Sequence, residues 1–188
     1  MREFILCSAS PRRRELFGNI VENFKISVPH IKEVPDPSAT TPGEIVMSLA
    51  RQKAQSMVGQ FEREILVCAD TMVFLDNQAM GKPKDRLDAA HMLRQLSGRT
   101  HTVCTGLAVV DAEKGSIQTD WEKTDVTFDN MSEGEIQEYV ATGDPMDKAG
   151  GYGIQGLASK FIVGIEGCYF NVVGLPVHKL YQMLRPYL

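Results

Sequence analysis

Three arginines lie at the expected start of a helix, where cations are unusual. Arg12, Arg13 and Arg14 follow Ser8-Ala9-Ser10-Pro11, in which Ser10 is a typical helix N-cap and the proline takes the first helical position. Each cation there opposes the helix dipole by about 0.3–1 kcal/mol. Free backbone N–H groups, serine hydroxyls and guanidinium groups together form an anion site, and phosphate is the anion that suits them best. The alternative is a solvated basic face, which Arg14 fits best.

Lys53 occurs on the inward face of a second expected helix. Thr41-Pro42-Gly43-Glu44 has the pattern of a capping box and opens a helix to about residue 59. Lys53 is four residues from both Leu49 and Met57, so the three share one face. A lysine there either extends to water or meets a buried anion, and the pattern slightly favours the first.

Asp70 directly follows the apolar run Ile65–Ala69 and precedes Thr71. A carboxylate that leaves a buried strand is costly unless it is paired or binds a metal. Ligands of α/β proteins bind at the carboxyl ends of central strands, so we expect a functional role for Asp70. The alternative is a structural salt bridge or a cap on a nearby turn.

Two further charged residues are unremarkable when taken alone. Lys82 lies between a glycine and a proline, in a constrained loop rather than on a helix. Glu33 lies in the loop from Pro29 to Pro42, which holds four prolines and has no regular period. A surface lysine and a loop acid are the simplest interpretations of the two.

A glycine-rich segment, Gly151–Gly156, matches the pattern of a dinucleotide-binding fingerprint. That motif must follow a strand and open a helix, whereas this segment follows polar residues and precedes a strand-like run at 161–165. The dinucleotide interpretation therefore fails. A glycine loop that lets the backbone approach a ligand, with Gln155 offering an amide, and a tight structural turn both stay open.

Composition excludes several classes of protein. The chain has 188 residues, a net charge of −4 and 43% hydrophobic residues, which excludes wholesale disorder. Without a polybasic block, a nucleic-acid polymer is not an expected partner. No apolar run approaches the ~20 residues that cross a bilayer, and the N-terminus is unlike a signal peptide, so we expect no membrane partner and a soluble, cytoplasmic protein.

The cysteines and histidines suggest no site. The four cysteines (Cys7, Cys68, Cys104 and Cys168) are widely spaced, which favours buried free thiols in a reducing cytoplasm over a zinc site. The four histidines are dispersed and have no serine or cysteine nucleophile motif beside them, so a hydrolytic triad is not expected.

Strands and helices alternate along the chain without a repeat or linker. We expect strands over 3–7, 24–28, 65–74, 103–110, 118–128, 161–165 and 169–173. We expect helices over 11–18, 42–59, 86–96 and 133–142, and a last one from Pro176. This order predicts an α/β fold with a mixed sheet. One domain over residues 1–188 follows, with room for two lobes around a central cleft.

The chain resembles the Maf nucleotide pyrophosphatases from about residue 4 to residue 185, with the motifs in order. The N-terminal motifs are Ser8-x-Ser10-Pro11-Arg12-Arg13-x-Glu15-Leu16, Ala69-Asp70-Thr71 and Lys82-Pro83. The later motifs are Met92-Leu93-x-x-Leu96-Ser97-Gly98-x-Thr100-His101, Asp147-Lys148-Ala149-Gly150-x-Tyr152-Gly153-Ile154-Gln155-Gly156 and Val173-Gly174-Leu175-Pro176.

The resemblance implies a nucleotide-metabolism hydrolase. Its substrate would be a small molecule, a nucleoside triphosphate, cleaved between the α- and β-phosphates to the monophosphate and pyrophosphate with a divalent cation, Mg²⁺ or Mn²⁺. It also implies an elongated α/β fold, a mixed sheet flanked by helices as in the inosine-triphosphate pyrophosphatases, and frequently a homodimer. Arg12, Thr71 and Gln155 resemble the dTTP/UTP branch, whereas the 7-methyl-GTP branch tends to carry tryptophan and glutamate at the first two positions.

The residues and the resemblance point to one site. The expected substrate-binding residues are Ser8, Arg12, Arg13, Lys53, Thr71, Lys82 and Gln155. Asp70 is the expected catalytic residue, which takes the proton of the attacking water. Asp70 and Glu33 are also the expected ligands of the metal.

Besides a 7-methyl-GTP pyrophosphatase, two other functions stay open. One is a nucleotide-binding regulator of cell division or septum formation, which would need the same phosphate contacts. Such a regulator gains nothing from Asp70, whose charge repels a polyphosphate. The other is a house-cleaning enzyme for damaged or modified nucleotides, including modified pyrimidines.

Overall fold

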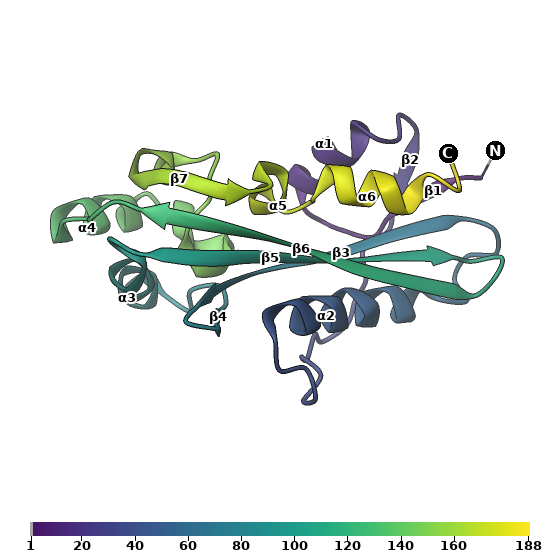
Figure 1. Ribbon diagram of the computed structural model, residues 1–188, viewed down its shortest axis with the longest axis horizontal. Helices are drawn as coiled ribbons and strands as arrows, with labels where there is room; N and C mark the ends of the chain where they lie inside the picture. The colour runs from purple at the N-terminus through teal and green to yellow at the C-terminus, as the bar shows by residue number, and fades with distance from the viewer. Residues whose placement is uncertain (1) are drawn as a thin grey trace. The chain divides into compact units, whose positions relative to one another are not determined.

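The computed structural model describes residues 2–188 and shows a mixed β-sheet flanked by helices (Figure 1). Strands pair in the order β2-β1-β3-β5-β6-β7, and β4 pairs with β3. The strands are β1 (Phe4–Leu6), β2 (Phe24–Ile26), β3 (Ile65–Leu75), β4 (Gln78–Met80), β5 (Thr100–Asp111), β6 (Ser116–Phe128) and β7 (Ile162–Gly167). The α-helices are α1 (Pro11–Gly18), α2 (Pro42–Met57), α3 (Arg86–Leu96), α4 (Glu133–Ala141), α5 (Tyr169–Val173) and α6 (Val177–Leu184). The expected fold class, α/β with a mixed sheet, is confirmed.

The chain forms two compact units. The first comprises the chain up to Thr71, Thr105–Glu122 and Gly174–Leu188. The second comprises Met72–Cys104 and Lys123–Val173. Strands β3, β5 and β6 each contribute residues to both units. The assignment of residues 1–188 to a single domain stays a prediction.

The first unit contains a parallel three-strand arrangement centred on β1. Phe4 pairs with Phe24 of β2 on one side and with Ile65 of β3 on the other. Parallel neighbours need crossover connections, which α1 supplies between β1 and β2 and α2 supplies between β2 and β3. The chain thus passes from one side of β1 to the other, which creates a topological switch point at the carboxyl ends of β1 and β3.

Helix α2 lies on one face of this part of the sheet, and α1 and α6 lie on the other (Figure 1). Thr41 and Glu44 form the capping box that the sequence predicts for α2, and Ser10 caps α1 as expected. Ala54 and Met57 of α2 pack on Cys68 in a buried cluster. Gly106 of β5 lets α2 come close, because a Cβ there would collide with the backbone of Val46.

The second unit is built from two antiparallel pairings and its own core. Asp76 and Asn77 adopt φ values of 51° and 63° in the turn between β3 and β4, a conformation that asparagine and aspartate tolerate better than most residues. Strand β7 pairs with β6 from Phe128 to Thr124. Helices α3 and α4 pack with these strands around one apolar cluster that includes Leu93 and Phe128.

The expected strand over 169–173 is wrong, because these residues form helix α5. Tyr169 and Phe170 are both exposed, whereas Asn171 is fully buried and donates to Val103 O and Thr124 Oγ1 at 3.0 and 2.9 Å. A short apolar run does not distinguish a strand from a buried helical turn. The tertiary partners of the Asn171 amide decide the conformation.

A helix that spans a bilayer must be both long and apolar. Within residues 2–188, every helix is too short or too polar to span a membrane.

Candidate active site

The turn after β1 is organised by two serines. The Ser8 hydroxyl oxygen accepts the backbone N–H of Ser10 at 3.2 Å, and the Ser10 hydroxyl oxygen accepts that of Arg13 at 3.4 Å. These bonds direct the N-terminus of α1 toward the switch point. Ser8 is buried, and because it accepts in this turn its hydroxyl hydrogen can be donated to a ligand.

Arg13 is held by the protein on three of its nitrogens. Nε donates to Gly174 O at 2.8 Å, Nη1 to Ala69 O at 2.9 Å and Nη2 to Thr71 Oγ1 at 2.9 Å. Burial lowers the pKa of the guanidinium from its ordinary value, and Asp70 and Glu33 oppose this shift. Arg13 therefore fixes α1 to β3 and to the segment before α6, and two of its five N–H donors stay available for an anion.

Arg12 contrasts with its neighbour. Its side chain is half-exposed and makes no hydrogen bond or ion pair with residues 2–188. Arg14 is exposed and makes none with that part of the chain either. Within the described residues, the Arg12 cation beside the turn therefore makes no contact that would stabilise the fold. Arg14 is exposed to solvent, as the sequence suggested.

Asp70, Lys53 and Glu33 form a charged cluster in the first unit. Lys53 Nζ lies 2.6 Å from Asp70 Oδ1 and 3.2 Å from Glu33 Oε2. It also donates to Ala69 O at 3.3 Å. The lysine therefore meets buried charge, and the expectation that it extends to water is wrong. The partner of Lys53 is Asp70, which points from β3 toward α2. The spacing of residues along the sequence does not show this pairing.

Asp70 does not end its strand, because β3 continues to Leu75. What ends near it is the pairing with β1, whose last pair is Leu6 with Val67, followed by the Cys7 N–H bond to Val67 O. Side chains alternate along a strand. Since Cys68 packs under α2, Asp70 points to the α2 face, and Thr71 points to the opposite one.

Thr71 belongs to a polar network on the α1 face. Its hydroxyl lies 2.8 Å from that of Thr105 and 3.3 Å from Gly174 O, in addition to its bond with Arg13. The network fixes the position of the Thr71 side chain. Thr105 and Gly174 are structural partners that sequence reasoning missed.

The carboxylates of Asp70 and Glu33 are the candidate ligands for a divalent cation in this cluster. No group of three or more His, Cys, Asp or Glu side chains is placed to hold a metal anywhere in residues 2–188. Asp70 and Glu33 nevertheless converge on one point, the Lys53 ammonium. Mg²⁺ is usually held by one or two carboxylates together with substrate phosphates, so this donor set fits a cation that arrives with a nucleotide.

Lys82 and Gln155 lie in the second unit, and both are exposed. Neither side chain makes an ion pair or hydrogen bond with the described residues. Their segments are joined, because Gly150 N donates to Gly81 O at 3.0 Å. The two predicted ligand-binding residues thus lie on adjoining segments of one unit.

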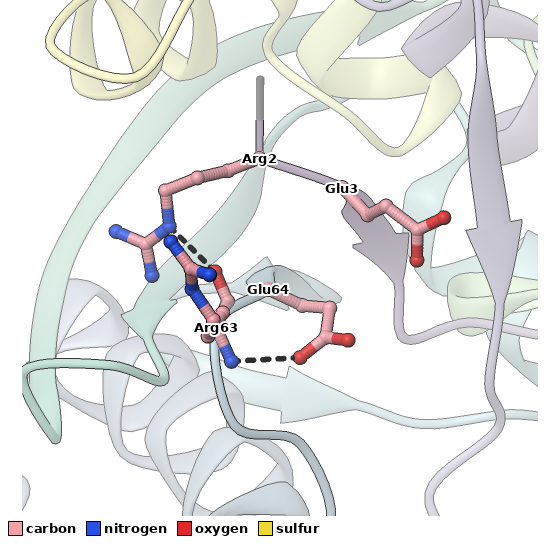
Figure 2. Close-up of a pocket in the computed structure, with 4 residues that line it drawn as sticks. All are labelled: Arg2, Glu3, Arg63 and Glu64. Atoms are coloured by element: carbon pink, nitrogen blue, oxygen red, sulfur yellow. Dashed lines mark hydrogen bonds between the residues drawn. The ribbon is translucent and has the colours of Figure 1, made fainter.

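A pocket lies near the N-terminus, within the first unit (Figure 2). It is lined by Arg2, Glu3, Arg63 and Glu64, none of them a predicted site residue. Arg2 pairs with the buried Asp111 at 2.6 Å, and its Nε donates to Arg63 O. These contacts attach Arg2 to the end of β5 and to the segment before β3.

A protein family matches nearly the full length of the chain. A family model described as Maf-like protein matches residues 3–187. The chain belongs to the Maf-like family. The resemblance in the motifs is thereby confirmed.

Similar curated proteins are related to this Maf-like chain over nearly its full length. A protein of Pelotomaculum thermopropionicum named dTTP/UTP pyrophosphatase is 49% identical over 187 residues, covering 100% of this chain and 97% of the relative. Proteins of the same name from Clostridium botulinum (strain Kyoto) and Desulforamulus reducens are 46% and 45% identical, each covering 98% of this chain and 96% of the relative.

Solved structures give a more distant likeness. A HAM1 protein from Coxiella burnetii has a TM-score of 0.49 and 14% identity, over 68% of this chain and 73% of the other. A nucleoside-triphosphatase (dITP/XTP pyrophosphatase) from Mycobacterium abscessus has a TM-score of 0.42 and 14% identity, over 69% and 75%.

Proposed function

We propose that this Maf-like protein hydrolyses dTTP and UTP to the monophosphate and pyrophosphate. The observation that carries the proposal is the 49% identity over 187 residues to a protein named dTTP/UTP pyrophosphatase. The first unit supplies a carboxylate cluster and Arg12, and the second supplies Lys82 and the exposed amide of Gln155; within residues 2–188 neither cation has an ion pair.

Asp70 is the proton acceptor for the attacking water in this proposal. An aspartate in solution has a pKa of about 3.9 and water one of about 15.7, a gap of roughly 12 units or about 16 kcal/mol. Asp70 and Glu33 would hold Mg²⁺ or Mn²⁺, which acidifies water and neutralises phosphate charge when bound. Asp70 then orients the water and receives its proton, while Lys53 holds the carboxylate in place.

Cations bind the triphosphate. A triphosphate carries about four negative charges, and charge-assisted contacts to phosphate oxygens are strong. Arg12 and Lys82 are free of protein partners within residues 2–188, and Arg13 retains two N–H donors. Ser8 adds a hydroxyl from the turn after β1.

Gln155 and the glycine-rich segment select the base. Thymine and uracil present two carbonyl acceptors around one N–H donor, whereas cytosine replaces one carbonyl by an amino donor. The Gln155 amide offers both a carbonyl and an NH₂ group and can pair with the imide edge. A site built for this edge leaves groups unpaired against cytosine, at a cost of about 1–3 kcal/mol each.

The proposal is tested by pyrophosphate release from dTTP, UTP, CTP, GTP and 7-methyl-GTP at equal concentrations, with Mg²⁺, with Mn²⁺ and with a chelator. We expect dTTP and UTP to be hydrolysed fastest, and only with a metal. Faster hydrolysis of 7-methyl-GTP would refute the branch assignment. Tight nucleotide binding without turnover would favour a regulator instead.

We also propose that the protein is cytoplasmic and forms a homodimer that binds neither a nucleic-acid polymer nor a membrane. The cysteines among residues 2–188 are free thiols, which suits a reducing compartment. Cell fractionation tests the location, and analytical ultracentrifugation of the purified chain tests the dimer. A monomer at micromolar concentration would contradict the second expectation.

A further inference from the structure

A buried histidine–tyrosine pair supports the glycine-rich segment of the second unit. His101 in β5 is 2% exposed and Tyr152 is 5% exposed. His101 Nε2 and the Tyr152 hydroxyl oxygen lie 2.6 Å apart, within hydrogen-bonding distance. Phe128 packs edge-on against both rings, with centroid distances of 5.1 and 4.8 Å. The Tyr152 ring is thereby clamped in the core of this unit.

Packing alone does not explain a histidine at this position. His101 Nδ1 is buried and has no hydrogen-bond partner among residues 2–188. Burial lowers the pKa of His101 to about 4, against a smaller opposing effect of Asp125, so the ring is neutral at pH 7. If the Tyr152 hydroxyl donates to Nε2, the single ring proton lies on Nδ1 and stays unpaired. An apolar side chain would fill this space without that cost, so the bond to Tyr152 is what the histidine adds.

Tyr152 is the one buried side chain of residues 150–156, all of which the structure describes. Before it, Gly150 and Gly151 adopt φ values of 69° and 72°, and Gly150 N is bonded to Gly81 O next to Lys82. Three residues after it, Gln155 is exposed. The segment that carries the amide is therefore fixed to the core through the Tyr152 ring and hydroxyl.

We propose that His101 is a positioning residue for base selection: by holding the Tyr152 hydroxyl, it fixes the backbone from which Gln155 presents its amide to the base. The proposal rests on the proposed hydrolysis of dTTP and UTP and names a residue that sets its selectivity. His101 touches no substrate in this arrangement. A small displacement of a positioning group is enough to weaken selection, because base pairing needs aligned donors and acceptors.

The test compares kcat/KM for UTP and CTP in the wild type and in His101→Leu, Tyr152→Phe, His101→Gln and the Leu/Phe double variant. The ratio of UTP to CTP should fall about tenfold in both single variants. It should fall no further in the double variant, because both changes remove one bond. Glutamine can place an amide where Nε2 lies, so His101→Gln should restore most of the ratio.

Hydrogen exchange of the nucleotide-free protein gives a readout that does not depend on activity. Amides of residues 150–156 should exchange faster in Tyr152→Phe, which keeps the ring and its packing, while those of α2 stay unchanged. Ile136→Val in α4 is the matched control, since it weakens the same buried cluster while it keeps the bond and the Phe128 ring, and it should keep the UTP/CTP ratio.

The two proposals fail in different ways. A wild-type protein that does not prefer UTP to CTP would refute the proposed function. A selective wild type whose Tyr152→Phe and His101→Leu variants keep the same ratio would refute the positioning role. An equal loss of the ratio in Ile136→Val would also refute it, because general loosening of the core would then explain the effect.

Discussion

At the scale of single residues, the turn after β1 separates cations that hold the fold from cations that are left for a ligand. Arg13 satisfies two backbone carbonyls and a threonine hydroxyl, whereas Arg12 makes no such bond with residues 2–188. Adjacent side chains of the same type thus have different tasks. Lys82 resembles Arg12, because it is exposed and has no ion pair in the described chain.

Substitution of the arginines should separate stability from activity. Arg13→Ala leaves the carbonyls of Ala69 and Gly174 without their donor, and we expect it to lower the free energy of unfolding by about 2–4 kcal/mol. Arg12→Ala and Lys82→Ala should each change stability by less than about 0.5 kcal/mol. They should lower kcat/KM about ten- to a hundredfold, through one lost phosphate contact each. Urea unfolding and pyrophosphate release measure the two effects, and unchanged kinetics would remove these residues from the site.

Replacement of the carboxylate tests the proton acceptor. Asp70→Asn is nearly isosteric but cannot accept the proton, so kcat should fall by about 10²–10⁴. Nucleotide binding should be equal or tighter, because a negative charge facing a polyanion is removed. Calorimetry with UTP and pyrophosphate release measure the pair of effects. A near-normal kcat would show that Asp70 has only the structural role of pairing with Lys53.

At the scale of elements, β3 presents the two halves of the first unit's polar site on opposite faces. Asp70 meets Lys53 of α2, and its neighbour Thr71 meets Arg13 of α1. Strand alternation and the crossovers around β1 make this separation necessary. The geometry of the Lys53–Asp70 pair then depends on how closely α2 approaches the sheet.

A methyl group at Gly106 should disturb that approach. Its Cβ would collide with the backbone around Val46 and Met47, and backbone cannot move aside as a flexible side chain can. We expect Gly106→Ala to lower the free energy of unfolding by about 1–3 kcal/mol and to reduce kcat as Lys53 moves from Asp70. Gly134→Ala in α4 is the control, since nothing lies within 4 Å of its Cβ, and it should be neutral or stabilising. Chemical denaturation of both variants measures this, and equal stability would show that α2 can shift freely.

At the scale of the whole molecule, a buried neutral histidine couples stability to pH. Burial lowers the pKa of His101 in the folded protein to about 4, from an ordinary value of 6.5. Between these values the unfolded chain binds more protons, so the free energy of unfolding should fall as the pH is lowered from about 6.5 to about 4. The difference corresponds to roughly 3 kcal/mol.

This pH dependence is measured by urea unfolding from pH 4 to pH 7. His101→Gln should flatten the profile in that window, whereas the exposed His91→Gln should leave it as in the wild type. Depressed carboxylates give a separate loss at lower pH, since the pKa of Asp111 is lowered to about 2 by Arg2. An unchanged profile in His101→Gln would show that the ring is not buried in its neutral form.

The sequence alone predicts most of the local structure and names the residues of the expected site, whose roles stay predictions. Proline and serine caps, the capping boxes and apolar periodicity act over a few residues, so α1, α2, α4 and the long strands follow from them. The family motifs predicted the activity, and the 49% identity to a protein named dTTP/UTP pyrophosphatase agrees with that prediction.

The tertiary structure sets which partner each polar group has. It made 169–173 a helix through the buried amide of Asn171. It also turned Lys53 to Asp70, gave Arg13 three protein acceptors and paired His101 with Tyr152. These contacts join residues that are 17 to 161 positions apart in the sequence. Patterns of residue types act over a few neighbouring positions, so they do not predict such pairings. The free energy of burying a charge or an amide is set by the partner that packing brings to it.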